Sequence, residues 1–169
     1  MNILELSQTR FSARKYTDKP VSDEDLAYIM ECARMAPSAV NRQPWKFIIV
    51  RSKEARERLW KAYDREWFQS APLYIVCMKN NAECWTRRKD DKKHGDIDVA
   101  IATEHICLAA TERGLGTCRV CNYDTDVMRE LFPSDDFEAV AIIPLGHIAD
   151  DCPRMEKNRK DMADIIETI

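Results

Sequence analysis

Residues 97–112 read IDVAIATEHICLAATE, and they predict a helix that is apolar nearly all the way round. A helix with one face in water carries a polar stripe, so this pattern indicates a helix covered on most sides, by its own fold or by a second copy of the chain. Gly114 and Gly116 follow it, and glycine readily adopts the left-handed conformation that ends helices. We expect this helix to form the centre of the fold.

Apolar runs on both sides of this helix predict the sheet that it covers. The expected strands are residues 45–50 (WKFIIV), 73–78 (LYIVCM), 117–121 and 138–146 (EAVAIIPLG). These runs are rich in β-branched and aromatic residues, which favour strands. The continuous apolarity of residues 73–78 is typical of a strand that is buried on both faces.

The remaining periodic segments predict more helices than strands. Helices are expected at residues 3–9, 23–35, 53–67, 125–132 and 160–168, and a solvated helix or loop at residues 80–96. Ser22 followed by Asp25 forms an N-cap arrangement for the helix at 23–35. This pattern favours an α+β or α/β fold with about four strands covered by helices. No linker or repeat divides the chain, so residues 1–169 are expected to form a single domain.

The charge composition excludes several classes of partner. The 26 basic and 29 acidic residues give a net charge of −3, which provides no general field for nucleic acid or for an anionic membrane surface. The N-terminus lacks a basic region followed by an apolar run, and no stretch of about 18 apolar residues occurs. We therefore expect a cytoplasmic protein without nucleic acid or membrane partners.

The cysteines and histidines do not complete a metal or nucleophile motif. Cys118 and Cys121 have C-x-x-C spacing, which occurs in redox dithiols and in half of a zinc site, but no second ligand pair stands at suitable spacing. Most cysteines are expected to be reduced and buried, and a thiol enzyme that uses this pair is an alternative. Glu104 and His105, within the apolar helix, are expected to have structural roles.

Motifs for side-chain catalysis are absent as well. The chain contains no G-x-G-x-x-G, P-loop or G-x-S-x-G sequence. No catalytic residue and no metal site are therefore predicted. If the protein is an enzyme, a bound cofactor carries the reaction and the protein holds that cofactor.

Basic residues outside the predicted helices concentrate near both ends of the chain. Arg10, Ser12 and Arg14 alternate in a non-periodic stretch, so in an extended conformation their side chains share one side. Lys157 and Arg159 repeat that spacing near the C-terminus. Paired cations with a hydroxyl suit a phosphate, because a guanidinium group donates to two oxygens at once. Ordinary surface charge is the alternative interpretation of either segment.

Four motifs, taken in order, resemble those of the FMN-dependent nitroreductase family. They are 10-RFSAR-14, 36-APSAVNRQPW-45, 114-GLGTCRV-120, and 144-PLGH-147 followed by 157-KNR-159, and they span nearly the whole chain. The resemblance implies a nitroreductase-like α+β fold with a mixed, mostly antiparallel sheet flanked by helices. It also implies an obligate homodimer with FMN at the subunit interface.

The resemblance further implies which residues contact the cofactor. The N-terminal and C-terminal motifs match phosphate-binding and ring-binding positions through Arg10, Phe11, Ser12, Arg14, Lys157 and Arg159. The loop that the partner lays along the flavin matches Pro37, Ser38, Ala39 and Asn41. The segment on the other side of the flavin, and the turn toward the phosphate, match Arg119, Val120, Cys121 and Gly146.

The loop at residues 36–45 has a composition that favours rigidity. Pro37 and Pro44 restrict φ to about −65°, which lowers the entropic cost of presenting Ser38 and Asn41 to a flat aromatic ligand. Trp45 is expected to anchor the loop to the core. The loop would thus form one wall of a flavin slot.

The implied activity is that of an FMN-dependent oxidoreductase. It would use NAD(P)H to reduce small electron-poor aromatics, such as nitro compounds and quinones, by a ping-pong mechanism. Arg14 would stabilise the negative charge of the reduced flavin and raise its reduction potential. Arg119 and Cys121 stand where the family commonly has Trp and Gly, and they favour an anionic substrate if they face the flavin. A non-catalytic FMN-binding or redox-sensing protein of the same fold is the alternative.

Overall fold

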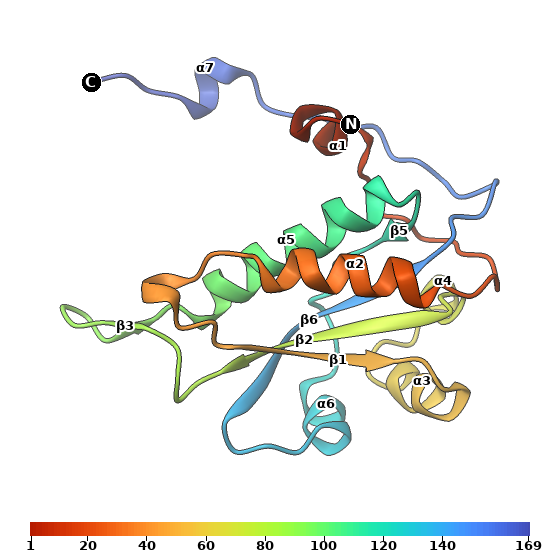
Figure 1. Ribbon diagram of the computed structural model, residues 1–169, viewed down its shortest axis with the longest axis horizontal. Coiled ribbons are helices and arrows are strands. Elements are labelled where there is room, and N and C mark those ends of the chain that lie inside the picture. Colours follow the sequence, from red (N-terminus) through yellow and green to blue (C-terminus); the bar gives the residue numbers. More distant parts are fainter.

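Four antiparallel strands form the main sheet, in the order β1-β2-β6-β5 (Figure 1). The computed structural model describes residues 1–169. The strands are β1 (Trp45–Val50), β2 (Leu73–Asn80), β5 (Gly116–Thr117) and β6 (Phe137–Gly146). β2 and β6 lie in the centre, and nearly all of β2 is buried, as its apolar sequence predicts. The predicted antiparallel sheet flanked by helices is confirmed.

The sheet is less mixed than the resemblance implied. All its ladders are antiparallel, and its parallel pairing is limited to one isolated bridge between Ser12 and Thr117. This bridge forms where the chain, after leaving α1 (Ile3–Thr9), passes beside β5. The strand expected at 117–121 is also shorter than predicted, because beyond Thr117 the pairing continues only as an isolated bridge from Val120 to Ile142.

The central helix is confirmed as α5 (Gly95–Glu112), which packs against α2 (Asp23–Arg34) over one face of the sheet (Figure 1). Val99, Ile106 and Ala110 of α5 are fully buried in the core cluster that both helices share with β2 and β6. Ser22 Oγ accepts the N–H of Asp25 at 3.0 Å, so the predicted N-cap begins α2. Burial on most sides explains why α5 lacks a polar stripe.

Only one of the two glycines after α5 has the expected left-handed conformation. Gly114 has a φ of 72° and follows the end of the helix. The prediction for Gly116 was wrong, because this residue is required for close packing instead. A Cβ at position 116 would lie 2.5 Å from Cγ1 of Ile148 and 2.9 Å from Cβ of Ala13.

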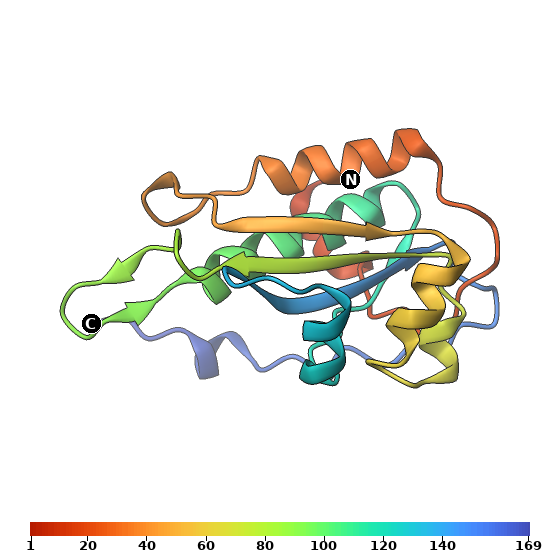
Figure 2. The same ribbon diagram turned by 90° about the horizontal axis from the view of Figure 1, so that it is seen from below.

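Three short helices cover the other face of the sheet (Figure 2). They are α3 (Lys53–Trp60), α4 (Glu66–Gln69) and α6 (Thr125–Leu131). The single helix predicted at 53–67 was wrong. The carbonyl of Ala62 accepts the N–H of Asp124 at 2.7 Å, so it is taken from the helical bond that it would make with Glu66. The chain turns there and restarts as α4.

The remaining elements are small and lie at the periphery. They are η1 (Ala39–Asn41), the hairpin of β3 (Thr86–Arg87) and β4 (Lys92–Lys93), and α7 (Met162–Ile165). The hairpin replaces the solvated helix or loop expected at 80–96, and α7 is shorter than the helix expected at 160–168. Figure 1 shows the C-terminal residues running past α1 and away from the sheet. No helix combines the length and apolarity that crossing a bilayer requires.

Candidate functional site

Residues 10–14 leave α1 and run beside β5, and this path orients their side chains. The N–H of Ala13 donates to the carbonyl of Thr117 at 2.9 Å, and the Ala13 side chain is fully buried. Because side chains alternate along an extended chain, Ser12 and Arg14 are directed away from the core. Arg10, at the C-cap of α1, completes the set that the spacing predicted.

The two ends of the chain meet at one cavity, which we call the cationic cavity. It has a volume of about 320 Å³ and is lined by Arg10, Phe11, Ser12, Arg14, Met155, Glu156, Lys157 and Arg159. Four of these side chains are cationic and Glu156 alone is acidic. The structure therefore brings together all the N-terminal and C-terminal residues that the sequence assigned to a phosphate site.

The cations of this cavity crowd one another. Lys157 Nζ donates to the carbonyls of Ser7, at 3.1 Å, and of Gln8, in the last turn of α1. Burial, followed by three neighbouring guanidinium groups, lowers the pKa of Lys157 from its ordinary 10.5. Those groups belong to Arg10, Arg159 and Arg154. A bound anion relieves such repulsion, so the cationic cavity fits a phosphate group.

Two residues beside the cationic cavity were not assigned to it from the sequence. The guanidinium carbon of Arg154 lies 4.4 Å from the ring centroid of Phe11. Oε1 of Glu104 lies 3.5 Å from Nε of Arg10, which agrees with the structural pairing expected for Glu104. Arg154 could have been found, because it continues the basic tail three residues before Lys157. Nothing local connects Glu104 with Arg10.

Arg14 extends from the same segment toward α4. Its guanidinium carbon lies 5.9 Å from the ring centroid of Trp67, within cation–π range. Ser70 Oγ accepts the N–H of Tyr16 at 3.2 Å and donates to the carbonyl of Trp67 at 2.7 Å. These contacts fasten α4 beside Arg14. Trp67 was missed because the sequence offers no sign that α4 would lie here.

The segment after β5 divides its residues between the core and the surface. Val120 is buried, and both its N–H and its carbonyl bond to Ile142 at 2.9 Å, so Val120 has no free group for a cofactor. Arg119 and Cys121 lie on the other side, where Arg119 Nε donates to Cys121 Sγ at 3.4 Å. The strand alternation thus places the Val120 side chain in the core, and its assignment as a cofactor contact stays a prediction.

Gly146 lies in a closely packed position at the end of β6. It pairs with Gly116 at the end of β6, and it does not line the cationic cavity. A Cβ at position 146 would lie 2.6 Å from Cδ of Pro72. This close packing lets the chain leave β6 toward the C-terminal tail, and the assignment of Gly146 to the cofactor stays a prediction.

The cysteines do not form a reactive pair. All seven are free thiols, with Cys118 buried and Cys121 exposed. Burial raises the pKa of the Cys118 thiol, although Arg14 and Ser12 oppose this effect. A nucleophilic or redox-active cysteine needs a lowered pKa, so the thiol-enzyme alternative loses support.

The loop between α2 and β1 lies far from the cationic cavity. Figures 1 and 2 place this loop at one end of α5, near the β3–β4 hairpin, and β5 near the other end. Of the four loop residues assigned to the flavin, none lines the cationic cavity. They are Pro37, Ser38, Ala39 and Asn41. One chain alone therefore does not unite the two groups of predicted cofactor contacts.

Left-handed residues, more than prolines, give this loop its shape. Val40, Asn41 and Gln43 have φ of 54°, 55° and 50°. Such a conformation costs roughly 1–2 kcal/mol for each residue with a side chain. Ser38 Oγ accepts the N–H of Gln43 at 2.8 Å, which closes the loop. The oxygen expected to face a ligand thus accepts one hydrogen bond within the loop, and its O–H remains available as a donor.

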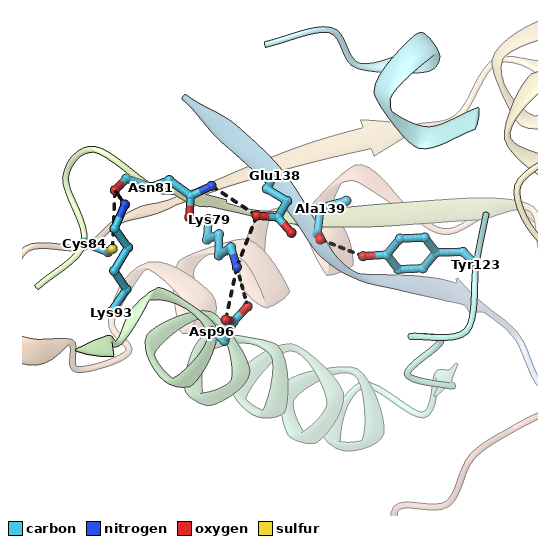
Figure 3. A network of polar contacts seen from close by, with 8 residues as sticks. All are labelled: Lys79, Asn81, Cys84, Lys93, Asp96, Tyr123, Glu138 and Ala139. Carbon is cyan, nitrogen blue, oxygen red and sulfur yellow. Dashed lines mark hydrogen bonds and ion pairs between the residues drawn. The ribbon is translucent and has the colours of Figure 1, made fainter. Parts of the chain in front are cut away.

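A second and larger cavity, of about 480 Å³, lies beside α6 and lacks a cationic cluster. Glu138, on its lining, belongs to a polar network with Lys79 and Asp96 (Figure 3). Lys79 Nζ lies 3.0 Å from Asp96 Oδ1 and 3.3 Å from Glu138 Oε2. Burial opposes the charge of Lys79, but the two carboxylates outweigh it and raise the pKa of Lys79. This network fastens β2, β6 and α5 together.

Comparisons with known proteins agree with this fold. A family model described as the nitroreductase family matches residues 8–68 and 60–147. A protein of Methanothermobacter thermautotrophicus, named for NADH dehydrogenase and NAD(P)H nitroreductase activity, is 32% identical over 161 residues. That match covers 89% of this chain and 79% of the relative.

Solved structures share the whole architecture. A nitroreductase family protein from Clostridium difficile 630 has a TM-score of 0.91 and 36% identity, over 99% of this chain and 98% of that one. A nitroreductase of Exiguobacterium sibiricum 255-15, solved in complex with FMN, has a TM-score of 0.85 and 20% identity, over 100% and 98% of the two chains. The latter shows likeness of fold. Since the family model spans most of the sequence, this chain belongs to the nitroreductase family.

Proposed function

We propose that this protein is an FMN-dependent oxidoreductase that takes hydride from NAD(P)H and reduces small electron-poor aromatics, such as nitro compounds and quinones, in a ping-pong sequence. Membership of the nitroreductase family, and a relative named for NAD(P)H nitroreductase activity, support the activity class. The FMN complex of a protein with the same fold supports the cofactor.

The cationic cavity is the observation that carries this proposal. Arg10, Lys157 and Arg159 would hold the FMN phosphate, with Ser12 as a further donor, because their charges crowd one another without it. Arg14 would lie beside the pyrimidine ring, where a fixed cation favours the reduced, anionic cofactor. FMN itself would supply the acceptance and delivery of hydride. The side chains of this protein would position the cofactor, stabilise its negative charge and shield it.

A second copy of the chain supplies the remaining wall of the site in this proposal. The loop that includes Ser38 is remote from the cationic cavity within one chain, and its Val40 is 75% exposed. The C-terminal tail also exposes apolar side chains, by 56–74%, at Met155, Met162, Ile165 and Ile166. Exposed apolar groups of this extent favour a protein interface. A homodimer would cover both segments and bring the loop to the partner's cofactor.

Anaerobic reduction tests the proposed function. The purified protein should be yellow, and NADH or NADPH should bleach the oxidised flavin before any second substrate is added. A quinone or a nitroaromatic should then restore the colour, as a ping-pong sequence requires. Flavin that neither nicotinamide bleaches would indicate a non-catalytic FMN-binding protein. A colourless protein whose activity is lost in Cys118→Ser with Cys121→Ser would support the thiol enzyme instead.

A further inference from the structure

The first turn of α5 holds a buried carboxylate that has no cationic partner. Asp98 is 2% exposed, and it takes part in none of the ion pairs of the structure. Its Oδ1 accepts the N–H of Ala39 at 2.9 Å, while its Oδ2 is buried without a hydrogen-bond partner. The helix N-terminus favours a negative charge here, but a carboxylate with a single hydrogen bond still weakens a fold. The contact with Ala39 therefore calls for an explanation.

That contact reaches the most strained part of the backbone. Three of the four residues from Val40 to Gln43 are left-handed, and none of them is glycine. Val40 is β-branched, for which this conformation is a genuine outlier, and it is 75% exposed, so burial of its side chain does not compensate. A loop of this shape persists only if the surrounding structure holds it.

Two side chains attach the loop to its surroundings: Asp98 from outside the loop and Arg42 from within it. Asp98 fastens the start of the loop, at Ala39, to the buried central helix. At the other end Arg42 Nη1 donates to the carbonyl of Glu83 at 3.2 Å, but Arg42 is exposed. The attachment through Asp98 is the more buried of the two, because the Asp98 side chain itself is buried. Its position on α5 ties the loop to the same rigid helix that carries Glu104, the partner of Arg10.

We propose that Asp98 is a positioning residue: through Ala39 it fixes the strained loop at residues 38–43 in the shape that orders the flavin ring of the partner subunit. This inference rests on the proposed function, in which that loop forms a wall of the FMN site. The phosphate is held elsewhere, in the cationic cavity. Loss of Asp98 should therefore disturb the ring and its reduction, and leave cofactor retention largely intact.

Asp98→Ala and Asp98→Asn, both loaded with FMN, test the inference against Thr103→Val. Thr103 is a matched control, because it is equally buried on α5 and its hydroxyl donates to Val99 of the same helix. Amide exchange at residues 39–43 should be about tenfold faster in Asp98→Ala, reporting the loop directly. Flavin reduction by NAD(P)H should slow about tenfold, and the FMN Kd should change less than about threefold. Asp98→Asn keeps an acceptor for Ala39 and should restore wild-type values.

Several outcomes would overturn the inference. The first is a wild-type rate of amide exchange in the loop of Asp98→Ala. The second is faster amide exchange while both flavin reduction and the visible circular dichroism of the flavin stay unchanged. The third is loss of FMN from Asp98→Ala. Failure of the proposed function would appear in the wild-type protein itself, which would contain no flavin or flavin that is never reduced. If wild-type flavin is bound but not reduced, its visible circular dichroism decides the inference.

A second variant guards against a misfolded Asp98→Ala. Ala39→Pro removes the same hydrogen bond from the donor side. Ser38, before it, has φ of −140° and ψ of 160°, an extended conformation that a following proline accepts, and position 39 is the first of its helical turn. It should reproduce the faster amide exchange at residues 40–43 and the slower flavin reduction of Asp98→Ala. Wild-type reduction and wild-type circular dichroism in Ala39→Pro would contradict the inference.

Discussion

Arg10 faces two negative groups in turn, the carboxylate of Glu104 and the phosphate proposed for the cationic cavity. Arg10→Ala removes a charged donor, so we expect FMN affinity to fall by on the order of 1.5–3 kcal/mol. Titration of the apoprotein with FMN, followed by flavin fluorescence, measures the change. Arg129→Ala is the control, because Arg129 pairs with Asp126 on α6 and should bind FMN normally. Unchanged affinity in Arg10→Ala would remove Arg10 from the site.

We expect Lys157 to make the affinity for FMN depend on pH in the alkaline range. Burial and neighbouring arginines lower its pKa below 10.5. In the folded protein without bound phosphate, the Lys157 ammonium group therefore loses its proton at a lower pH than in the unfolded chain. A bound phosphate favours the charged form, and FMN affinity should therefore fall as pH rises through that lowered pKa. Lys157→Arg keeps its charge and should remove this step of the profile. Identical profiles for the two proteins would show that Lys157 does not contact the phosphate.

At the scale of elements, close packing around β5 orients the N-terminal part of the site. Gly116 lies against Ala13 and Ile148, and a Cβ there would approach Ile148 Cγ1 to 2.5 Å. We expect Gly116→Ala to destabilise the fold by about 1–3 kcal/mol, which a lower midpoint of thermal unfolding would report. In the Ile148→Ala background Gly116→Ala should cost less, because Ile148→Ala removes the nearest clashing atom, although Ala13 Cβ remains 2.9 Å away. If the double variant loses at least as much free energy of unfolding as the two single variants together, another contact is responsible for the effect of Gly116→Ala.

At the scale of the whole molecule, we expect the C-terminal tail to link cofactor binding with assembly. It contributes Lys157 and Arg159 to the cationic cavity, and beyond them it exposes Met162, Ile165 and Ile166. Replacing these three apolar residues with Ser should weaken a homodimer by about tenfold or more in Kd, since it removes apolar surface that association would bury. Sedimentation equilibrium over a range of concentrations measures this. The basic residues stay in place, so any loss of FMN would follow from dissociation.

Two outcomes would contradict the proposed role of the tail and of the homodimer. A variant that assembles as the wild type does would show that the exposed tail residues lie outside the interface. A wild type that stays monomeric at all concentrations and still binds FMN would reject the shared site. Within one chain, the remote loop at residues 38–43 would then have no cofactor to border.

Much of the architecture followed from local pattern. Alternating or continuous apolar runs set β1, β2 and β6, the apolar circumference of α5 placed it at the centre, and the cap at Ser22 began α2. The every-second-residue spacing of Arg10, Ser12 and Arg14 put these side chains on one side, because an extended backbone alternates. These features depend on near neighbours in sequence, which is why the sequence alone determined them.

Tertiary contacts decided the rest. Beyond the end of α3, where periodicity favoured a continuing helix, Asp124 bonds the carbonyl of Ala62, and Ile142 bonds both backbone groups of Val120. Asp98 holds Ala39 from another element, and no local pattern marks it. In each case the partner is distant in the chain, so the competition for one hydrogen bond is settled only when the elements pack. The sequence thus determined the kinds of groups present and their sides, and the folded structure determined which of them meet.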